Sequence, residues 1–151
     1  MPPVRHTTGR GRSSYIAAVR PAVAKPTGAA MTSQYWKLPL NAQEIVGEVK
    51  WAANGVSLEV KGPQTLVVES LVQGPGTLLL HLVNYDVERR PSVENVEVTV
   101  RLPHGKTAAG GRLYSPDSAS SPTLTLVTKG DLVTFTVPRT RTYSIAKIEL
   151  Q

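Results

Sequence analysis

Acidic side chains are the first candidates for chemistry in this chain. A pair of carboxyl groups about 5 to 9.5 Å apart across a cleft can hydrolyse a glycosidic bond. Glu69 lies in a strongly apolar run, and Asp86, Glu88 and Glu94 crowd one polar segment. Glu69 is the best single candidate for a catalytic carboxyl group, because a charged residue is least expected there. Acids that alternate with apolar residues are nevertheless typical of the solvent face of a sheet, and this interpretation is favoured.

Nucleophiles and metal ligands are poorly represented. The chain has no cysteine, which excludes thiolate zinc sites and disulfides, and it has no Gly-x-Ser-x-Gly turn. Its three histidines, His6, His81 and His104, fall in an N-terminal segment, a predicted strand and a predicted turn. We expect His81 to be a sheet histidine satisfied by a neighbour rather than a general base. The sequence predicts no metal site and no cofactor.

Aromatic rings are the second candidates, because their faces can bind pyranose rings while nearby amides and carboxylates bind hydroxyl groups. The rings considered are Tyr35, Trp36, Trp51, Tyr85, Tyr114 and Tyr143. Trp51 and Tyr143 are expected to pack in the interior. Tyr85 lies in Asn84-Tyr85-Asp86, and Tyr114 precedes Ser115-Pro116-Asp117, so both come where a predicted strand ends. We predict sugar-binding residues Tyr85, Tyr114, Asn84 and Asp86, with ordinary structural tyrosines as the simpler alternative.

The net charge of +6 is confined to the first 43 residues, which contain six basic residues and no acidic one. The rest of the chain is neutral. A basic segment attached to a neutral domain is more typical of a solvated tail than of a nucleic-acid reader. Aromatic residues make up only 5% of the chain and offer few stacking platforms for single strands. The composition therefore disfavours a nucleic-acid partner.

Membrane segments are not expected either. No stretch reaches the roughly 18 apolar residues needed to cross a bilayer. Residues 15–19 are too short for the apolar region of a signal peptide, and Arg20 and Pro21 interrupt any extension. The compartment remains unassigned.

Three regions must position these side chains. Residues 1–40 form a basic arm rich in proline and glycine, with one short strand expected at Ser14–Val19. Residues 41–54 are predicted to form the single helix, with Asn41 as N-cap and Gly55 at the C′ position. Its apolar stripe, expected to face the interior, consists of Ile45, Val46, Val49 and Ala53.

Residues 55–151 show the alternation of strands. Short apolar-polar runs are separated by turn signals such as Gly74-Pro75-Gly76 and Lys129-Gly130-Asp131. The expected strands are 56–60, 65–72, 77–85, 96–102, 108–114, 124–128, 132–137 and 143–150. About eight strands at this spacing predict an all-β fold, an antiparallel immunoglobulin-like β-sandwich.

Several of these runs carry a resemblance to a known family. His81–Tyr85, Val96–Pro103, Leu113–Asp117 and Val133–Pro138, with the closing strand from Tyr143, resemble the C-terminal β-sandwich domain of large multidomain glycoside hydrolases related to the β-galactosidase clan. The order and spacing match over about 95 residues. Upstream, residues 11–16 resemble the last strand of the glutamine-amidotransferase-like domain that precedes the sandwich, and residues 35–53 resemble its final helix.

The resemblance implies an accessory role. In those enzymes the catalytic carboxylates lie in a TIM barrel N-terminal to this region, and this sequence has no positions onto which they can be carried. It also implies that residues such as Ile16, Val19, Trp36 and Leu38, which would pack inside the missing domain, are exposed. We therefore expect self-association into a homo-oligomer through the N-terminal arm.

Three functional hypotheses follow. The favoured one is a noncatalytic, carbohydrate-associated β-sandwich module that binds sugar or promotes oligomerisation. The alternative is a small glycoside hydrolase that uses Glu69 and an acid of the Asp86–Glu94 loop. The third is a basic protein that binds polyanions.

Overall fold

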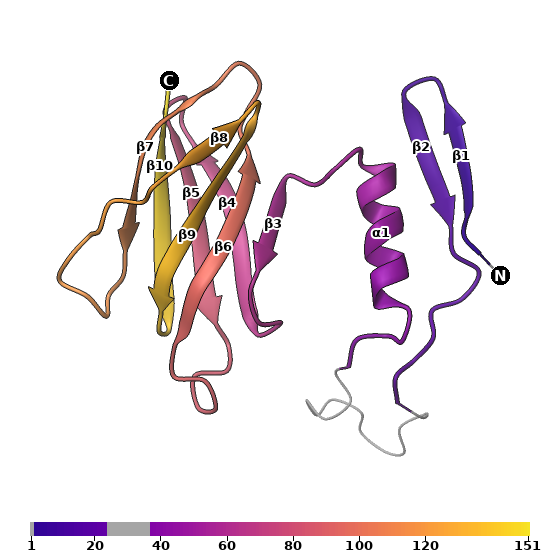
Figure 1. Cartoon of the computed structure of the whole chain (residues 1–151), viewed down its shortest axis with the longest axis horizontal. Helices are drawn as coiled ribbons and strands as arrows, with labels where there is room; N and C mark the ends of the chain where they lie inside the picture. Colours follow the sequence, from indigo (N-terminus) through magenta and orange to yellow (C-terminus); the bar gives the residue numbers. More distant parts are fainter. Residues whose placement is uncertain (1, 24–36) are drawn as a thin grey trace. The chain divides into compact units, whose positions relative to one another are not determined.

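The computed structural model describes residues 2–23 and 37–151 (Figure 1). The chain divides into two compact units, Met1–Val56 and Ser57–Gln151. We refer to them as the N-terminal unit and the sandwich unit. Within the described residues, no helix is long and apolar enough to cross a membrane.

The N-terminal unit begins with a β-hairpin instead of the single strand expected at Ser14–Val19. Strands β1 (Val4–Thr8) and β2 (Gly11–Tyr15) pair antiparallel, with Thr8 opposite Gly11. Gly9 has a φ of 59° in the connecting two-residue turn. Glycine reaches this left-handed conformation without a steric penalty, which makes the tight reversal possible. The prediction was wrong because the arm's glycines were taken as breakers rather than as a turn.

Helix α1 (Ala42–Ala52) follows the predicted helix closely, and Asn41 takes the predicted N-cap position, but its side chain makes no capping hydrogen bond to the helix backbone. The buried Asn41 side chain instead accepts a hydrogen bond from the Arg20 amide at 2.9 Å and donates to the Ala18 carbonyl at 3.0 Å. It also donates to Glu44 Oε2 at 3.1 Å. Asn41 therefore fastens the preceding segment to the start of the helix.

The end of α1 is a Schellman turn centred on Asn54 rather than on the expected Gly55. Asn54 has a φ of 55°, which places it at C′. The Gly55 amide donates to the Lys50 carbonyl at 2.8 Å, and the Asn54 amide donates to the Trp51 carbonyl at 3.2 Å. Asparagine takes the left-handed conformation more readily than most residues, so it replaces glycine here.

The apolar stripe of α1 does not form an interior, contrary to expectation. Val46 is 47% exposed and Val49 is 55% exposed. The helix residue that is buried is Glu48, at 8% exposure. The N-terminal unit therefore buries a charge and leaves valines at its surface.

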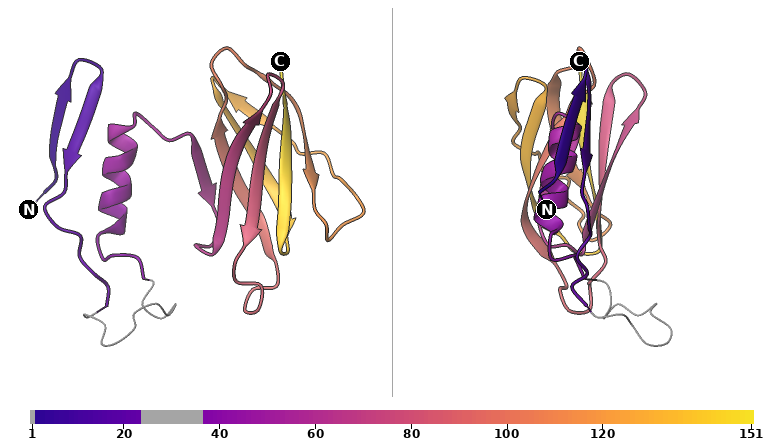
Figure 2. Two further views of the ribbon diagram at one scale, coloured as in Figure 1. Left: turned by 180° about the vertical axis from the view of Figure 1, so that it is seen from behind. Right: turned by 90° about the vertical axis from the view of Figure 1, so that its right-hand side faces the viewer.

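The sandwich unit confirms the predicted all-β antiparallel sandwich. Two four-stranded sheets, with strand orders β4-β5-β10-β7 and β3-β6-β9-β8, face each other (Figures 1 and 2). The strands are β3 (Leu58–Lys61), β4 (Leu66–Gln73), β5 (Thr77–Asn84), β6 (Val93–Arg101), β7 (Ala108–Tyr114), β8 (Val127–Lys129), β9 (Leu132–Thr140) and β10 (Tyr143–Leu150).

The core lies between the two sheets and follows the alternation of the sequence. On β5, Leu78, Leu80 and Leu82 point inward, and they meet alternate valines of β6 and β9 in one cluster. Alternate residues of a strand point to opposite faces, so a period of two places one apolar set inside. The turn Gly130–Asp131 joins β8 to β9, as predicted, with Lys129 opposite Leu132.

Strand β9 continues past Pro138, where the sequence predicted an end at Val137. Val137 pairs with Val96 and Arg139 pairs with Glu94, so the register is the same on both sides of Pro138 and Asn95, and these two residues face each other without pairing. Asn95 has a φ of 54°. Proline is tolerated at such an irregularity, because no ladder hydrogen bond is required of its nitrogen. The extension carries β9 to Thr140 and places Arg139 in the strand.

Candidate functional site

The candidate site lies at the end of the sandwich where β9 turns into β10. Strands β5 and β7 both run antiparallel to β10, which lies between them, so both finish at this end. The loop that follows β5 and the loop that follows β7 therefore meet the β9–β10 turn. We call residues 84–92, 115–122 and 138–142 the β9–β10 end.

One predicted sugar-binding tyrosine, Tyr85, lies in the β9–β10 end, and the other, Tyr114, lies directly before it in sequence. Tyr85 follows β5 and is 74% exposed, and Tyr114 closes β7 and is 40% exposed. Neighbouring strands are about 4.8 Å apart, so β5 and β7 are separated by about 10 Å across β10. Tyr143 opens β10 between them, and the register places it on the same sheet face as Tyr114.

Asn84, also predicted to bind sugar, is buried and positions the loop instead. Its Nδ2 donates to the carbonyls of Arg90 at 2.7 Å and Arg141 at 2.9 Å. Its Oδ1 accepts from the amide of Asp86 at 3.1 Å. The structure thus uses the Asn84 Nδ2 group for hydrogen bonds inside the protein.

The structure does not bring the candidate catalytic acids together. Glu69 is exposed on β4, directly opposite His81, and lies three residues short of the level of Asn84. That offset corresponds to about 10 Å along the strand. Asp86 lies two residues beyond Asn84, so it is further still from Glu69 along the chain. Glu88 is exposed in the loop after β5. Glu94 lies on β6, in the other sheet.

His81 is satisfied within the sheet, as the sequence predicted. Its Nδ1 lies 2.6 Å from the hydroxyl oxygen of Tyr143, and the two rings stack with centroids 6.0 Å apart. Tyr143 is only half-buried on the outer face of this sheet, although it was expected inside. The pair is an internal contact of the sheet, and no general-base role is needed to explain it.

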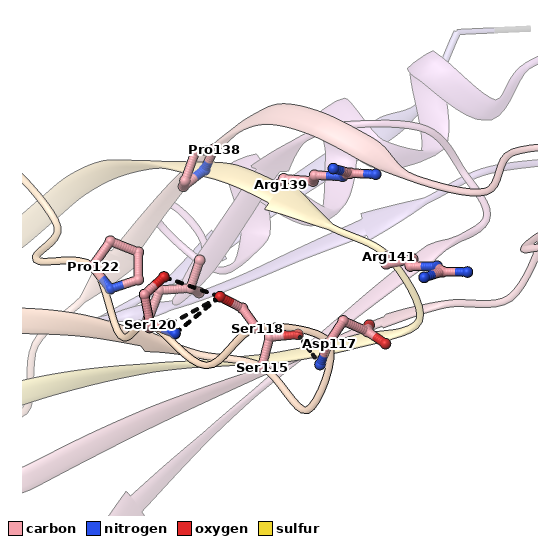
Figure 3. A pocket seen from close by; sticks show the side chains of 9 residues that line it. Ser115, Asp117, Ser118, Ser120, Pro122, Pro138, Arg139 and Arg141 are labelled. Atoms are coloured by element: carbon pink, nitrogen blue, oxygen red, sulfur yellow. Dashed lines mark hydrogen bonds between the residues drawn. The ribbon is translucent and has the colours of Figure 1, made fainter.

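A pocket of about 280 Å³ opens at the β9–β10 end (Figure 3). It is lined by Leu113, Ser115, Asp117, Ser118, Ser120, Pro122, Pro138, Arg139 and Arg141. The lining comes from the end of β7, the loop that follows it, and the end of β9. None of these residues was predicted from the sequence to bind a ligand.

Hydrogen bonds fasten the pocket loop to the β9–β10 turn. The Ser115 hydroxyl donates to the Tyr143 carbonyl at 2.8 Å, and the Thr142 amide donates to Asp117 Oδ2 at 3.3 Å. Further along, the Ser118 hydroxyl donates to the Ser120 carbonyl at 3.2 Å. The wall of the pocket is therefore held by the protein's own contacts.

Arg139 and Arg141 supply the cations of the pocket. They are two residues apart, and the residue between them, Thr140, is buried. Both arginines are exposed, and Figure 3 shows their guanidinium groups reaching in the same direction. Within the residues that the structure describes, neither side chain has an ion-pair partner within 4 Å. The motif Arg-Thr-Arg at the end of an alternating strand was the available sequence signal.

A second charged cluster lies in the N-terminal unit, where its side chains hydrogen-bond to one another. Arg5 donates to both carboxylate oxygens of Glu48 at 2.8 Å, and the Ser14 hydroxyl donates at 2.6 Å. These bonds, that from Arg5 first, lower the pKa of Glu48 to about 2. Trp51, expected in the core, is half-buried, with the guanidinium carbons of Arg5 and Arg12 at 4.8 and 5.7 Å from its ring centroid.

Four apolar residues, Ile16, Val19, Trp36 and Leu38, were expected to be exposed. Val19 and Leu38 are exposed, and Ile16 is half-buried. Trp36, like Tyr35, lies outside the described residues. Across the described ranges, no group of three or more histidine, cysteine, aspartate or glutamate side chains is arranged to hold a metal ion.

Comparison with known proteins adds a likeness of fold. No model of a known protein family matches the chain, and no curated protein sequence matches it. Among solved structures, the chain resembles alpha-L-fucosidase isoenzyme 2 from Paenibacillus thiaminolyticus, with a TM-score of 0.59 and 18% identity over 73% of this chain. It also resembles a Paenibacillus sp. cycloisomaltooligosaccharide glucanotransferase, with a TM-score of 0.50 and 18% identity over 60% of this chain.

Both neighbours are much longer than this chain. The matched region covers 18% of the fucosidase chain and 16% of the glucanotransferase chain. Each name describes an enzyme that acts on carbohydrate. The sandwich architecture therefore also occurs as a small part of carbohydrate-active enzymes.

Proposed function

We propose that the sandwich unit is a noncatalytic carbohydrate-binding module, accessory to glycoside hydrolases. The observation that carries the proposal is the pocket at the β9–β10 end, which combines proline rings, hydroxyl groups and charged side chains. Sugars present apolar C–H faces and many hydroxyl groups, so a site with both kinds of lining suits them. The occurrence of the same architecture within a fucosidase and a glucanotransferase supports this choice of ligand.

The arrangement of acids favours a binding role over a catalytic one. Glycoside hydrolysis requires two carboxyl groups facing each other across the substrate. Asp117 is the single acid of the described pocket lining, and its Oδ2 accepts from the Thr142 amide. Glu69 lies on β4 and Glu94 on β6, in different sheets.

We extend the proposal to the origin of the two units. The sandwich unit corresponds to the C-terminal sandwich of the β-galactosidase-related enzymes. The N-terminal unit corresponds to the end of the domain that precedes it. Strand β2 (Gly11–Tyr15) and helix α1 (Ala42–Ala52) occupy the segments on which that resemblance rests.

Affinity electrophoresis tests the binding function. The full chain is run through gels containing soluble polysaccharides, and reducing ends released from the same polysaccharides are measured in parallel. We expect retardation without release. Tyr85 and Tyr114 are not part of the pocket lining, so they test whether a longer sugar chain also contacts the surface beside the pocket. Tyr85→Ala and Tyr114→Ala should then each weaken retardation about tenfold, since loss of an aromatic contact costs on the order of 1 to 2 kcal/mol. Tyr15→Ala is the matched control, because Tyr15 is an exposed tyrosine of the other unit.

Two results would overturn this function. Absence of retardation by every polysaccharide would remove the binding role. Release of reducing ends that is abolished by Glu69→Gln, with an unchanged circular dichroism spectrum, would establish the alternative of a small glycoside hydrolase.

For the N-terminal unit we propose self-association with a second copy of this chain. The exposure of Leu40, Val46 and Val49 supports it, because exposed apolar side chains gain free energy when a partner buries them. Sedimentation equilibrium should give a mass above the monomer's 16.2 kDa. The double change Val46→Ser and Val49→Ser should return it to the monomer, and a monomeric unmodified chain would contradict the proposal.

A further inference from the structure

The pocket at the β9–β10 end has an apolar part and a charged part. In Figure 3, Pro122 and Pro138 lie together on one side, Ser118 and Ser120 lie between, and the heads of Arg139 and Arg141 lie on the other side. The carboxylate of Asp117 is on the same side as the guanidinium groups. A ligand that fills this space therefore needs an apolar surface at one end and a group that accepts hydrogen bonds from cations at the other.

The two arginines are placed to act on one group. Arg139 lies in β9 and Arg141 in the turn directly after it, on either side of the buried Thr140, and Figure 3 shows both guanidinium groups reaching in the same direction. Arginine presents planar N–H donors that match a carboxylate or sulfate in pairs. Asn84 Nδ2 donates a hydrogen bond of 2.9 Å to the Arg141 carbonyl, and this bond holds the backbone of Arg141 in place. A contact from the end of β5 therefore fixes the backbone that carries the Arg141 guanidinium group.

The nearby acids do not neutralise both arginines. Asp117 is the pocket's own carboxylate, and one of its oxygens is occupied by the Thr142 amide. Glu94 lies opposite Arg139 in the register of β6 and β9, and its Oε1 accepts from the Ser92 hydroxyl at 3.4 Å. Arg139 therefore has an acidic strand neighbour, whereas Arg141 lies beyond the register of that pair. We therefore expect Arg141 to bind an anion more tightly than Arg139 does.

We propose that this pocket binds an acidic saccharide, a sugar ring that carries a carboxylate or sulfate, with Arg141 and Arg139 on the anion and the prolines against the ring. The inference rests on the proposed carbohydrate-binding function and names its ligand class. Asp117 and the serines are left to bind ring hydroxyl groups. The pocket's 280 Å³ is at the lower limit of the roughly 300 to 1,000 Å³ of small-molecule sites, which suits one sugar unit.

Matched sugar pairs test the ligand class by isothermal titration calorimetry of the full chain. The pairs are the methyl glycosides of glucuronate and glucose, those of galacturonate and galactose, and a sulfated and an unsulfated galactose. Members of a pair share the ring and differ in the charged group. We expect at least tenfold tighter binding of the acidic member in at least one pair, and we expect this preference to fall as salt rises from 50 to about 200 mM, because salt screens the charge.

Charge-removing variants locate the site. Arg141→Gln should abolish the preference for the acidic sugar, and Arg139→Gln should reduce it about threefold. Arg112→Gln is the control, since Arg112 is an exposed arginine on β7 outside the pocket lining and its loss changes the net charge equally. We expect this control to prefer the acidic sugar to the same extent as the unmodified chain does.

The outcomes separate this inference from the function on which it rests. Equal binding of acidic and neutral members overturns the inference and leaves the carbohydrate-binding function standing. A preference that survives both glutamine changes also overturns it, because the anion then binds elsewhere. Inorganic sulfate that binds as tightly as the acidic sugar contradicts the role of the ring. Absence of binding by all sugars here, and by all polysaccharides in the gels, removes both proposals.

Discussion

The two units bury different kinds of side chain. The sandwich unit places leucines, valines and Phe135 between two sheets, in one apolar cluster. The N-terminal unit encloses the carboxylate of Glu48 between Arg5 and Ser14 and leaves Val46 and Val49 at its surface. Burial of apolar surface is nondirectional and additive, whereas a buried ion pair depends on the geometry of every partner.

The two proposals divide along this difference. The sandwich unit has the packed core that can hold the pocket lining in place, and ligand binding is proposed for it. Among its described residues, the N-terminal unit buries Glu48 and exposes Val46 and Val49, and self-association is proposed for it.

The largest effect is expected from truncating the core of the sandwich unit. Leu80 has no exposed surface, so Leu80→Ala should lower the free energy of unfolding by about 2 to 5 kcal/mol. Urea denaturation followed by circular dichroism measures the loss. Leu71→Ala on the neighbouring strand β4 is the control, because Leu71 is largely exposed and its change should cost well under ~1 kcal/mol. Equal losses for the two variants would contradict the described core.

The N-terminal unit should respond to acid through Glu48. Its folded pKa of about 2 is below the ordinary value of 4.5, so the folded unit binds fewer protons than the unfolded one. The stabilisation is therefore complete above pH 5 and is lost as pH falls from about 5 to 2. The protection factor of the β1 and β2 amides, which is the intrinsic exchange rate of an unstructured amide divided by the observed rate, should therefore fall across this range.

Glu48→Gln sharpens this comparison between the units. The variant should exchange its hairpin amides faster at pH 7 and should lose the acid dependence. Glu44→Gln is the control, since Glu44 lies on the same helix but contacts Asn41 rather than Arg5. A protection factor of the unmodified hairpin that does not change between pH 5 and 2 would show that the ion pair does not hold it.

A smaller effect is expected at Thr140 in the sandwich unit. Its hydroxyl is buried and has no hydrogen-bond partner. Thr140→Val keeps the shape and removes the unsatisfied oxygen, so stability should stay equal or rise by about 1 kcal/mol. Thermal unfolding measures the change. A fall of more than about 1 kcal/mol would mean that the hydroxyl makes a stabilising bond.

The smallest effect is expected at the surface pair Arg101–Asp131. The Arg101 Nη1 lies 2.6 Å from Asp131 Oδ2, but both side chains are exposed to water. Exposed pairs contribute about 0 to 1 kcal/mol. Asp131→Asn should therefore change the urea midpoint only slightly, and that change should shrink further in high salt. A change comparable to that of Leu80→Ala would contradict the ranking.

The sandwich unit was predictable because its information is local and repeated. Each strand alternates with a period of two, and turns such as Gly130–Asp131 mark the reversals. The all-β sandwich follows from these two signals without knowledge of which strands pair. Two extensions of three residues were missed, β9 past Val137 and β6 before Val96, and both cross an irregularity at Asn95 that only the pairing reveals.

The N-terminal unit and the pocket were less predictable, since both depend on residues far apart in sequence. Glu48 appears in sequence as a helix-surface residue, and nothing near it indicates that Arg5 lies against it. Asn84 carries a polar amide at a strand end, but its burial depends on Arg141. Arg139 and Arg141 were counted only as charges, because their common direction is seen only in the folded chain, where β9 ends at Thr140 and the turn begins at Arg141.

The most direct test of the account is the location of bound sugar on the full chain. Amide proton and nitrogen shifts of the labelled protein are recorded while an oligosaccharide that retards it in gels is added. We predict shifts concentrated in residues 115–122 and 138–142, together with Tyr85 and Tyr114. Shifts confined to residues 2–56, or spread over the strands away from the β9–β10 end, would contradict the assignment of binding to this end of the sandwich unit.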